Sequence, residues 1–162
     1  MLSEQQISSL YEMLLEEVTS MQIESPHVNE QETSFTSRVL YPWLRDWVAA
    51  LRKPGLYVRG DGGPSISPVV WHGITFRPDL GIYSGQNKYV AVEIKLLTNA
   101  DPGGSLTKAV GQTLMYEELG FAKSLGLIFD LSRNIGGKFQ TLEKIEINPR
   151  VQVHILGSSP NN

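Results

Sequence analysis

The sequence contains no cysteine. This absence excludes disulfides, thiolate metal sites and cysteine nucleophiles, and it suits a reducing cytosol. The sequence also has no apolar run near the roughly 18 residues that cross a bilayer. Its N-terminus lacks the basic and then apolar order of a signal peptide. We therefore expect a cytoplasmic protein with no membrane-spanning segment.

A strong charge of one sign is missing too. The 162 residues include 14 Lys and Arg against 17 Asp and Glu, a net charge of -3. This balance argues against a broad basic surface for phosphate contacts. However, an enzyme that gathers carboxylates around metal ions carries local acid that the ions offset. The basic residues between positions 38 and 77 could face a phosphate backbone, and a solvated helix face explains them equally well. They are Arg38, Arg45, Arg52, Lys53, Arg59 and Arg77.

The length and the 41% hydrophobic content predict a single globular domain over residues 1–162. Residues 3–22 have apolar side chains at alternating spacings of three and four, which predicts a helix with one apolar face. Ser3 and Gln6 resemble a capping box. The apolar positions are Ile7, Tyr11, Leu14, Val18 and Met21. This stripe is expected to pack on its own domain, and a homodimer contact through residues 3–22 is the alternative.

A second helix is expected after Asn29, which can act as its N-cap. It should end near the breaker cluster at residues 53–55, and Pro42 should kink or interrupt it. Its expected buried stripe consists of Phe35, Val39, Trp43 and Trp47. Glu32 lies on the same stripe, one turn before Phe35.

From residue 56 onward the pattern is typical of strands and turns. We expect extended segments over 56–60, 69–83 and 89–97, with 84–87 forming the turn of an antiparallel hairpin. A glycine-rich loop over 98–105 should precede a helix over 106–124. The apolar run 124–132 suits a strand buried on both faces. Further strands are expected over 142–148 and 151–156, followed by a tail at 157–162. This order predicts an α/β domain.

Three charged residues in this region point to chemistry. Glu93 and Lys95 project from the same side of their strand, about 7 Å apart along it. A charged pair in an apolar strand is costly unless its members pair or bind something. The hairpin would bring Asp79 beside Glu93, and two adjacent carboxylates repel unless a cation lies between them or one is protonated. Without cysteine, that cation should be an oxygen-preferring ion such as Mg²⁺, with Mn²⁺ able to substitute. An ordinary ion-pair set is the simpler alternative.

Pro78-Asp79 followed by Glu93-Ile94-Lys95 resembles the signature of the PD-(D/E)XK nuclease superfamily. The resemblance implies a restriction-endonuclease-like αβββαβ core over about residues 30–155, with a central mixed sheet flanked by helices and an extra N-terminal helix. It implies that Asp79, Glu93 and the backbone carbonyl of Ile94 bind the catalytic metal. It also implies that Lys95 positions the attacking water and stabilises developing charge.

Two further matches extend this resemblance. An acid on the preceding helix often completes the metal site, and Glu32 is preferred over Glu30 because of its helix face. Gln112 and Tyr116 resemble the Q-x-x-x-Y element of RecB-type members, and their spacing places them on one helix face. The simpler explanations are a first-turn acid for Glu32, and surface polarity and core edge for Gln112 and Tyr116.

The sequence therefore predicts a Mg²⁺-dependent nuclease, endo- or exonucleolytic, with DNA favoured over RNA as its partner. A ribonuclease is the enzymatic alternative. A nucleic-acid-binding or assembly protein that keeps the fold without catalysis is the alternative from another class. Because no separate recognition domain is visible, a nuclease subunit whose target is recognised by a partner protein is a further possibility.

Overall fold

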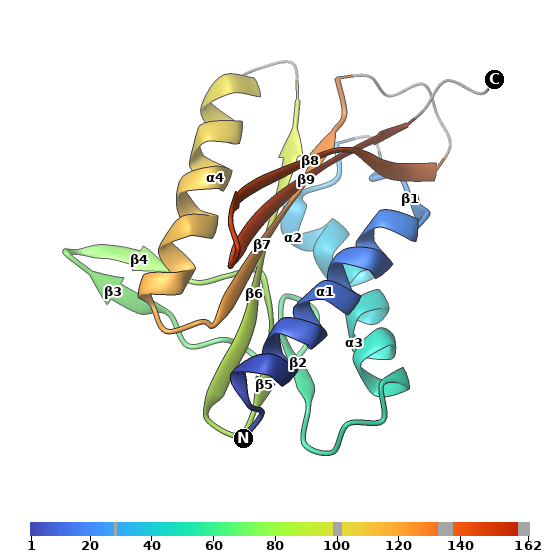
Figure 1. The fold of residues 1–162 in the computed structure, drawn as a ribbon. Coiled ribbons are helices and arrows are strands. Elements are labelled where there is room, and N and C mark those ends of the chain that lie inside the picture. The colour runs from blue at the N-terminus through green and yellow to red at the C-terminus, as the bar shows by residue number, and fades with distance from the viewer. Residues whose placement is uncertain (28, 99–101, 133–137, 159–162) are drawn as a thin grey trace.

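The computed structural model describes residues 1–27, 29–98, 102–132 and 138–158. A mixed seven-stranded sheet has helices on both of its faces, so the protein is α/β (Figure 1). The helical segments are α1 (Glu4–Ser20), α2 (Glu32–Phe35), the π-helical turn η1 (Thr36–Leu40), α3 (Tyr41–Ala50) and α4 (Pro102–Glu118). No helix in the described ranges is long and apolar enough to cross a membrane.

The main sheet has the strand order β1-β8-β9-β7-β6-β5-β2. Its strands are β1 (Ile23–Glu24), β2 (Tyr57–Gly60), β5 (Leu80–Ser84), β6 (Asn87–Leu97), β7 (Lys123–Asp130), β8 (Lys138–Asn148) and β9 (Val151–Ser158). Strand β7 pairs in parallel with both β6 and β9, and the other neighbours are antiparallel. As the sequence predicted, β7 is buried on both faces and residues 84–87 close the β5–β6 hairpin.

Helix α1 confirms most of the first prediction. Ser3 and Gln6 form the capping box. The apolar stripe packs on the sheet of its own chain, and Tyr11, Leu14 and Val18 lie in the main hydrophobic core together with Leu10, which the stripe omitted. A homodimer through residues 3–22 stays a prediction for a solution mass measurement. Such a contact would have to use the outer face of α1.

The second helix differs from its prediction in a systematic way. Its N-cap is Gln31, and Asn29 instead lies outside the helix with a φ of 59°. The buried stripe continues from Phe35 through Leu40, Leu44 and Val48. The expected positions Val39, Trp43 and Trp47 are only partly buried. The π-helical turn causes this shift, because a π turn takes up one more residue than an α turn. Pro42 lies in the first turn of α3, so it does mark the break.

Several boundaries also differ, including the end of α4 at Glu118 instead of 124 and the start of β8 at Lys138 instead of 142. The extended segment 69–83 is interrupted, since β3 (Val69–Trp71) and β4 (Ile74–Phe76) form a separate hairpin before β5 begins. His72 and Gly73 close it with positive φ values of 48° and 78°, as two-residue hairpin turns require. Helix α4 begins at Pro102, inside the expected loop 98–105. Strand β9 extends to Ser158, two residues into the expected tail, and residues 159–162 lie outside the described residues.

Candidate active site

Asp79 and the motif on β6 meet where the β5–β6 hairpin brings them together. Leu80 pairs with Val92, so Asp79, which immediately precedes β5, lies opposite the charged part of β6. The Ile94 backbone N–H donates a hydrogen bond of 2.7 Å to Asp79 Oδ2. The predicted proximity of Asp79 and Glu93 is therefore present, and a backbone contact fixes the orientation of the Asp79 carboxylate.

Gly60, a residue that sequence reasoning missed, sets the backbone position of Asp79. A side chain at Gly60 would place its Cβ 2.1 Å from the Asp79 carbonyl oxygen, and the φ of +135° is one that other residues rarely adopt. The next residue, Asp61, donates its backbone N–H to the same carbonyl at 2.9 Å. The only signal in the sequence was a glycine at the end of a strand candidate.

Lys95 joins two acids that are distant in the sequence. Its Nζ lies 2.6 Å from Glu32 Oε1 and 3.3 Å from Glu93 Oε1. The second oxygen of Glu32 accepts a hydrogen bond of 3.1 Å from the Leu96 backbone N–H. Glu32, the first residue of α2, thus contacts β6 through both of its carboxylate oxygens.

Glu30, the fallback for this position, points to a different partner. Arg38 donates to both of its carboxylate oxygens, at 3.0 Å and 2.8 Å. These hydrogen bonds lower the pKa of Glu30 to about 2. Of the two acids, Glu32 is therefore the one that contacts Lys95, and its part in a metal site stays a prediction.

Helix α4 supplies the remaining predicted residues. The hydroxyl of the fully buried Tyr116 donates to Glu93 Oε2 at 2.5 Å. Gln112 lies one turn earlier, and its buried Oε1 has no hydrogen-bond partner among the described residues. We call Glu32, Asp79, Glu93, Lys95 and Tyr116 the acidic cluster. Gln112 shares the helix face of Tyr116 and has an unused acceptor.

The electrostatics of the acidic cluster disfavour its charged acids. Burial and the charge of Glu93 raise the pKa of Asp79, although the hydrogen bond from Ile94 opposes the shift. Burial likewise raises the pKa of Glu93, against the hydrogen bond from Tyr116 and the charge of Lys95. Burial alone would lower the pKa of Lys95, but the hydrogen bond to Glu32 and the charge of Glu93 outweigh it, so that pKa is raised. Lys95 is therefore cationic, and its single positive charge does not offset the negative charges that Asp79 and Glu93 carry when both are ionised.

The donor set fits a hard divalent cation. Mg²⁺ prefers oxygen ligands and is commonly held by one or two carboxylates while it keeps several waters. Asp79 and Glu93 supply two adjacent carboxylates, and Gln112 carries an unpartnered Oε1 one helical turn before Tyr116 on α4. Within the described ranges, no group of three or more His, Cys, Asp or Glu side chains is arranged to hold a metal ion. An ion bound here would take its remaining ligands from backbone, water or substrate.

Compared with protein-family models, with curated proteins and with solved structures, the chain matches none.

Proposed function

We propose that this protein is a metal-dependent nuclease that hydrolyses phosphodiester bonds, with DNA as the favoured substrate. One observation carries the proposal: Asp79, Glu93 and Lys95 converge at a single point of the β5–β6 hairpin, joined by Glu32 from α2. Two acids and a lysine at a largely buried point are costly for stability. A role in binding a cation and a phosphate accounts for their presence.

The order of the elements supports a restriction-endonuclease-like core. From α3 through β2, β5, β6, α4 and β7 the chain follows the order αβββαβ. In this assignment α1 precedes the core and the β3–β4 hairpin is an insertion between its first two strands. Strands β8 and β9 extend the sheet beyond β7.

Each residue of the acidic cluster has a role in this proposal. Asp79 and Glu93, together with the Ile94 carbonyl, would hold the ion, and Tyr116 would keep the Glu93 carboxylate oriented. Bound Mg²⁺ lowers the pKa of a coordinated water and stabilises the leaving oxygen. Lys95 would position the attacking water and balance the charge that develops on the phosphate. Glu32 would hold the ammonium group of Lys95 in place.

A cleavage assay tests the proposal. The wild type, Lys95→Ala and the control Lys144→Ala would be given supercoiled plasmid, linear duplex, single-stranded DNA and RNA, with Mg²⁺, Mn²⁺ or EDTA. Lys144 is an exposed lysine on β8, which β9 and β7 separate from β6 in the sheet. We expect cleavage that needs the metal, persists in Lys144→Ala and disappears in Lys95→Ala.

The same assay separates the alternatives. Cleavage of RNA alone would make the protein a ribonuclease. Binding without cleavage of any substrate by the folded wild type would favour a non-catalytic binding protein, or a subunit that needs a recognition partner. Full activity in Lys95→Ala would overturn the proposed role of the acidic cluster.

A further inference from the structure

A small pocket lies on the same side of the sheet as the acidic cluster and is not used by the proposed chemistry. Its volume is about 180 Å³, and residues from β2, β5 and the β3–β4 hairpin line it together with the segment between α4 and β7. Asp79 and Tyr83 are four residues apart on one face of the β5 segment, which places them about 13 Å apart along the strand. Pro78, the neighbour of Asp79, also lines the pocket.

Aromatic rings and cations form the walls of this pocket, which we call the aromatic pocket. Its ring-bearing residues are Phe76, Tyr83 and Phe121, and its charged residues are Arg59 and Lys88. No acidic side chain is among the residues that line it. The aromatic pocket therefore carries positive charge, unlike the acidic cluster.

Two polar groups of the pocket lack partners. The Nε of Arg59 and the hydroxyl of Tyr83 are buried without a hydrogen bond to any described residue. The guanidinium of Arg59 lies over the rings of Tyr57 and Tyr83, 5.3 Å and 5.6 Å from their centroids, and forms no ion pair within the described ranges. Burial raises the pKa of Tyr83 to about 12, so its hydroxyl keeps its proton. Because unsatisfied buried polar groups are costly, these two groups indicate a ligand that accepts hydrogen bonds.

The backbone makes room for this arrangement. Gly81 lies opposite Arg59 in the β2–β5 register, and a Cβ there would lie 2.7 Å from the Tyr83 ring. Tyr57 stacks on Tyr83 with centroids 6.0 Å apart, which supports the ring from behind. The missing side chain at Gly81 thus lets the Tyr83 ring lie beside Arg59.

We propose that the aromatic pocket receives one unpaired base of the nucleic-acid strand that the acidic cluster cleaves, an inference that rests on the proposed nuclease function. A base is planar, stacks on aromatic rings and offers ring nitrogen and carbonyl acceptors to arginine and hydroxyl groups. The pocket volume is below the range of about 300–1,000 Å³ typical of sites for drug-sized ligands, so it suits a single ring system. Lys88, the other cation of the pocket, would attract an adjoining phosphate. The consequence is a preference for single-stranded or frayed DNA near the cleavage point.

Equilibrium binding in EDTA tests this without cleavage. The probes are a fluorescent thymidylate oligonucleotide, the same strand made abasic at its central positions, and a blunt duplex. The variants are Arg59→Leu, the conservative Tyr83→Phe and the matched control Arg52→Leu, which removes an exposed cation that does not line the pocket. We expect the wild type and Arg52→Leu to bind the base-bearing strand at least about fivefold more tightly than the abasic strand, the lower end for stacking of one base.

The pocket variants should lose that preference while keeping the salt-dependent binding to phosphates. Arg59→Leu should bind base-bearing and abasic strands equally, and Tyr83→Phe should show an intermediate ratio. Equal binding of the two strands by the wild type would overturn the pocket assignment and leave the nuclease proposal standing. No binding and no cleavage of any nucleic acid would overturn both. If Arg59→Leu does not fold, Tyr83→Phe still decides the assignment, since it removes only one oxygen atom.

Discussion

The acidic cluster and the aromatic pocket lie on one face of the sheet and differ in which interactions their buried groups lack. In the acidic cluster, Asp79 and Glu93 repel each other, and burial raises the pKa of both. In the aromatic pocket, Arg59 and Tyr83 hold buried polar groups that no described residue satisfies. One end is short of positive charge and the other is short of hydrogen-bond acceptors. A bound metal ion would supply the missing positive charge, and an unpaired base would supply the missing acceptors. The two proposals therefore assign this face of the sheet to one nucleic-acid substrate and its metal ion.

The largest expected effect is at the acidic cluster. Glu93→Gln removes a metal-binding charge and keeps the shape of the side chain. We expect cleavage to fall by at least about 100-fold, the scale seen when one charge-stabilising group is lost from an active site. The control is Glu118→Gln, an exposed acid on α4. Initial rates on the preferred substrate would measure the difference, and unchanged rates in Glu93→Gln would place the reaction elsewhere.

A smaller effect is expected at Tyr116, which contacts the Glu93 carboxylate. Tyr116→Phe removes the hydroxyl that donates to Glu93 Oε2. Loss of such an orienting partner typically weakens metal affinity by about 10- to 100-fold. We therefore expect the half-maximal Mg²⁺ concentration for cleavage to rise by that amount, with activity largely restored at high Mg²⁺. The control Tyr89→Phe removes a hydroxyl that contacts Leu2, far from the acidic cluster. A loss of rate that high Mg²⁺ does not restore would contradict this positioning role.

Stability should move in the opposite direction to activity at Asp79. The folded pKa of Asp79 is above its unfolded value, so between the two values the folded state binds more protons and its stability falls as pH rises. The side chain in Asp79→Asn cannot ionise, so the variant does not lose stability as pH rises in this way. Its side-chain carbonyl still accepts the hydrogen bond from the Ile94 N–H. We expect it to be inactive and, in EDTA near neutral pH, to melt about 2–4 °C above the wild type, the equivalent of about 1 kcal/mol. The difference should shrink in acid, and a lower melting temperature near neutral pH would contradict the repulsion described above.

The smallest effect is expected in the aromatic pocket. Tyr83→Phe removes a hydroxyl that has no partner in the described structure, so the free energy of unfolding should change by less than about 0.5 kcal/mol. Tyr11→Phe is the contrasting control, because its hydroxyl donates to the Ser124 carbonyl and accepts from the Gln152 N–H. It should cost about 1–3 kcal/mol. Urea unfolding of both variants would measure this, and an equal loss in Tyr83→Phe would mean that its hydroxyl is already satisfied.

The sequence predicted the acidic cluster well because its signals are local. Strand alternation placed Glu93 and Lys95 on one face, and a short hairpin turn placed Asp79 opposite them. Helical spacing placed Gln112 and Tyr116 on one face, and the resemblance suggested that this face meets the active strand, as Tyr116 does. The contact of Glu32 with Lys95 spans 63 residues and was not predicted, because the resemblance to a nuclease motif suggested Glu32 only as an acid that completes the metal site.

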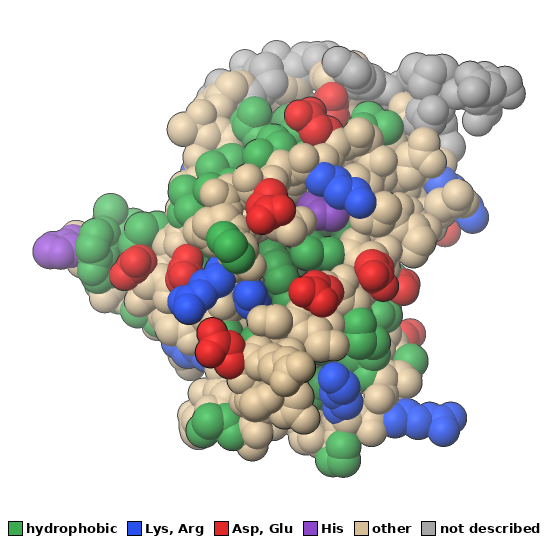
Figure 2. Space-filling model, viewed as in Figure 1, with side chains coloured by type: hydrophobic (Ala, Val, Ile, Leu, Met, Phe, Trp, Pro, Cys, Tyr) green, Lys and Arg blue, Asp and Glu red, His purple; other side chains and the backbone are tan. Residues whose placement is uncertain are grey.

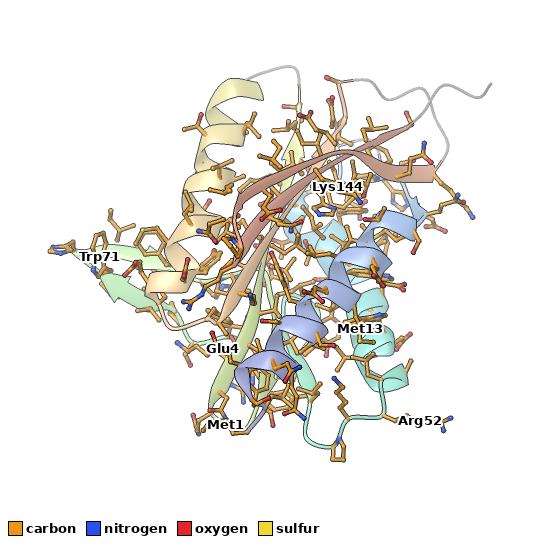
Figure 3. All side chains as sticks on the ribbon, viewed as in Figure 1. Met1, Glu4, Met13, Arg52, Trp71 and Lys144 are labelled. Atoms are coloured by element: carbon orange, nitrogen blue, oxygen red, sulfur yellow. The ribbon has the colours of Figure 1, made fainter. Side chains whose placement is uncertain are left out.

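The sequence did not predict the aromatic pocket, because it is assembled from five separate segments. Arg59 and Tyr83 become neighbours only through the β2–β5 pairing. The sequence analysis expected one extended segment over 69–83 and so did not predict the β3–β4 hairpin, which forms one wall of the aromatic pocket. This hairpin projects from the sheet with Trp71 near its end (Figure 3). Figure 2 shows hydrophobic side chains gathered on it, in agreement with the exposure of Val70, Trp71 and Ile74.

The π-helical turn at Thr36–Leu40 has a consequence for changes in chain length. It separates Glu32, which reaches Lys95, from the face of α3 that carries Leu44 and Val48. Phe35 and Leu40 share the buried face although they are five residues apart. With one residue fewer between them they would be four apart, the spacing of an ordinary α-helix. A one-residue deletion here would turn the π turn into α-helix without rotating either half. We therefore expect a single-residue deletion at this point to leave the position of Glu32 unchanged.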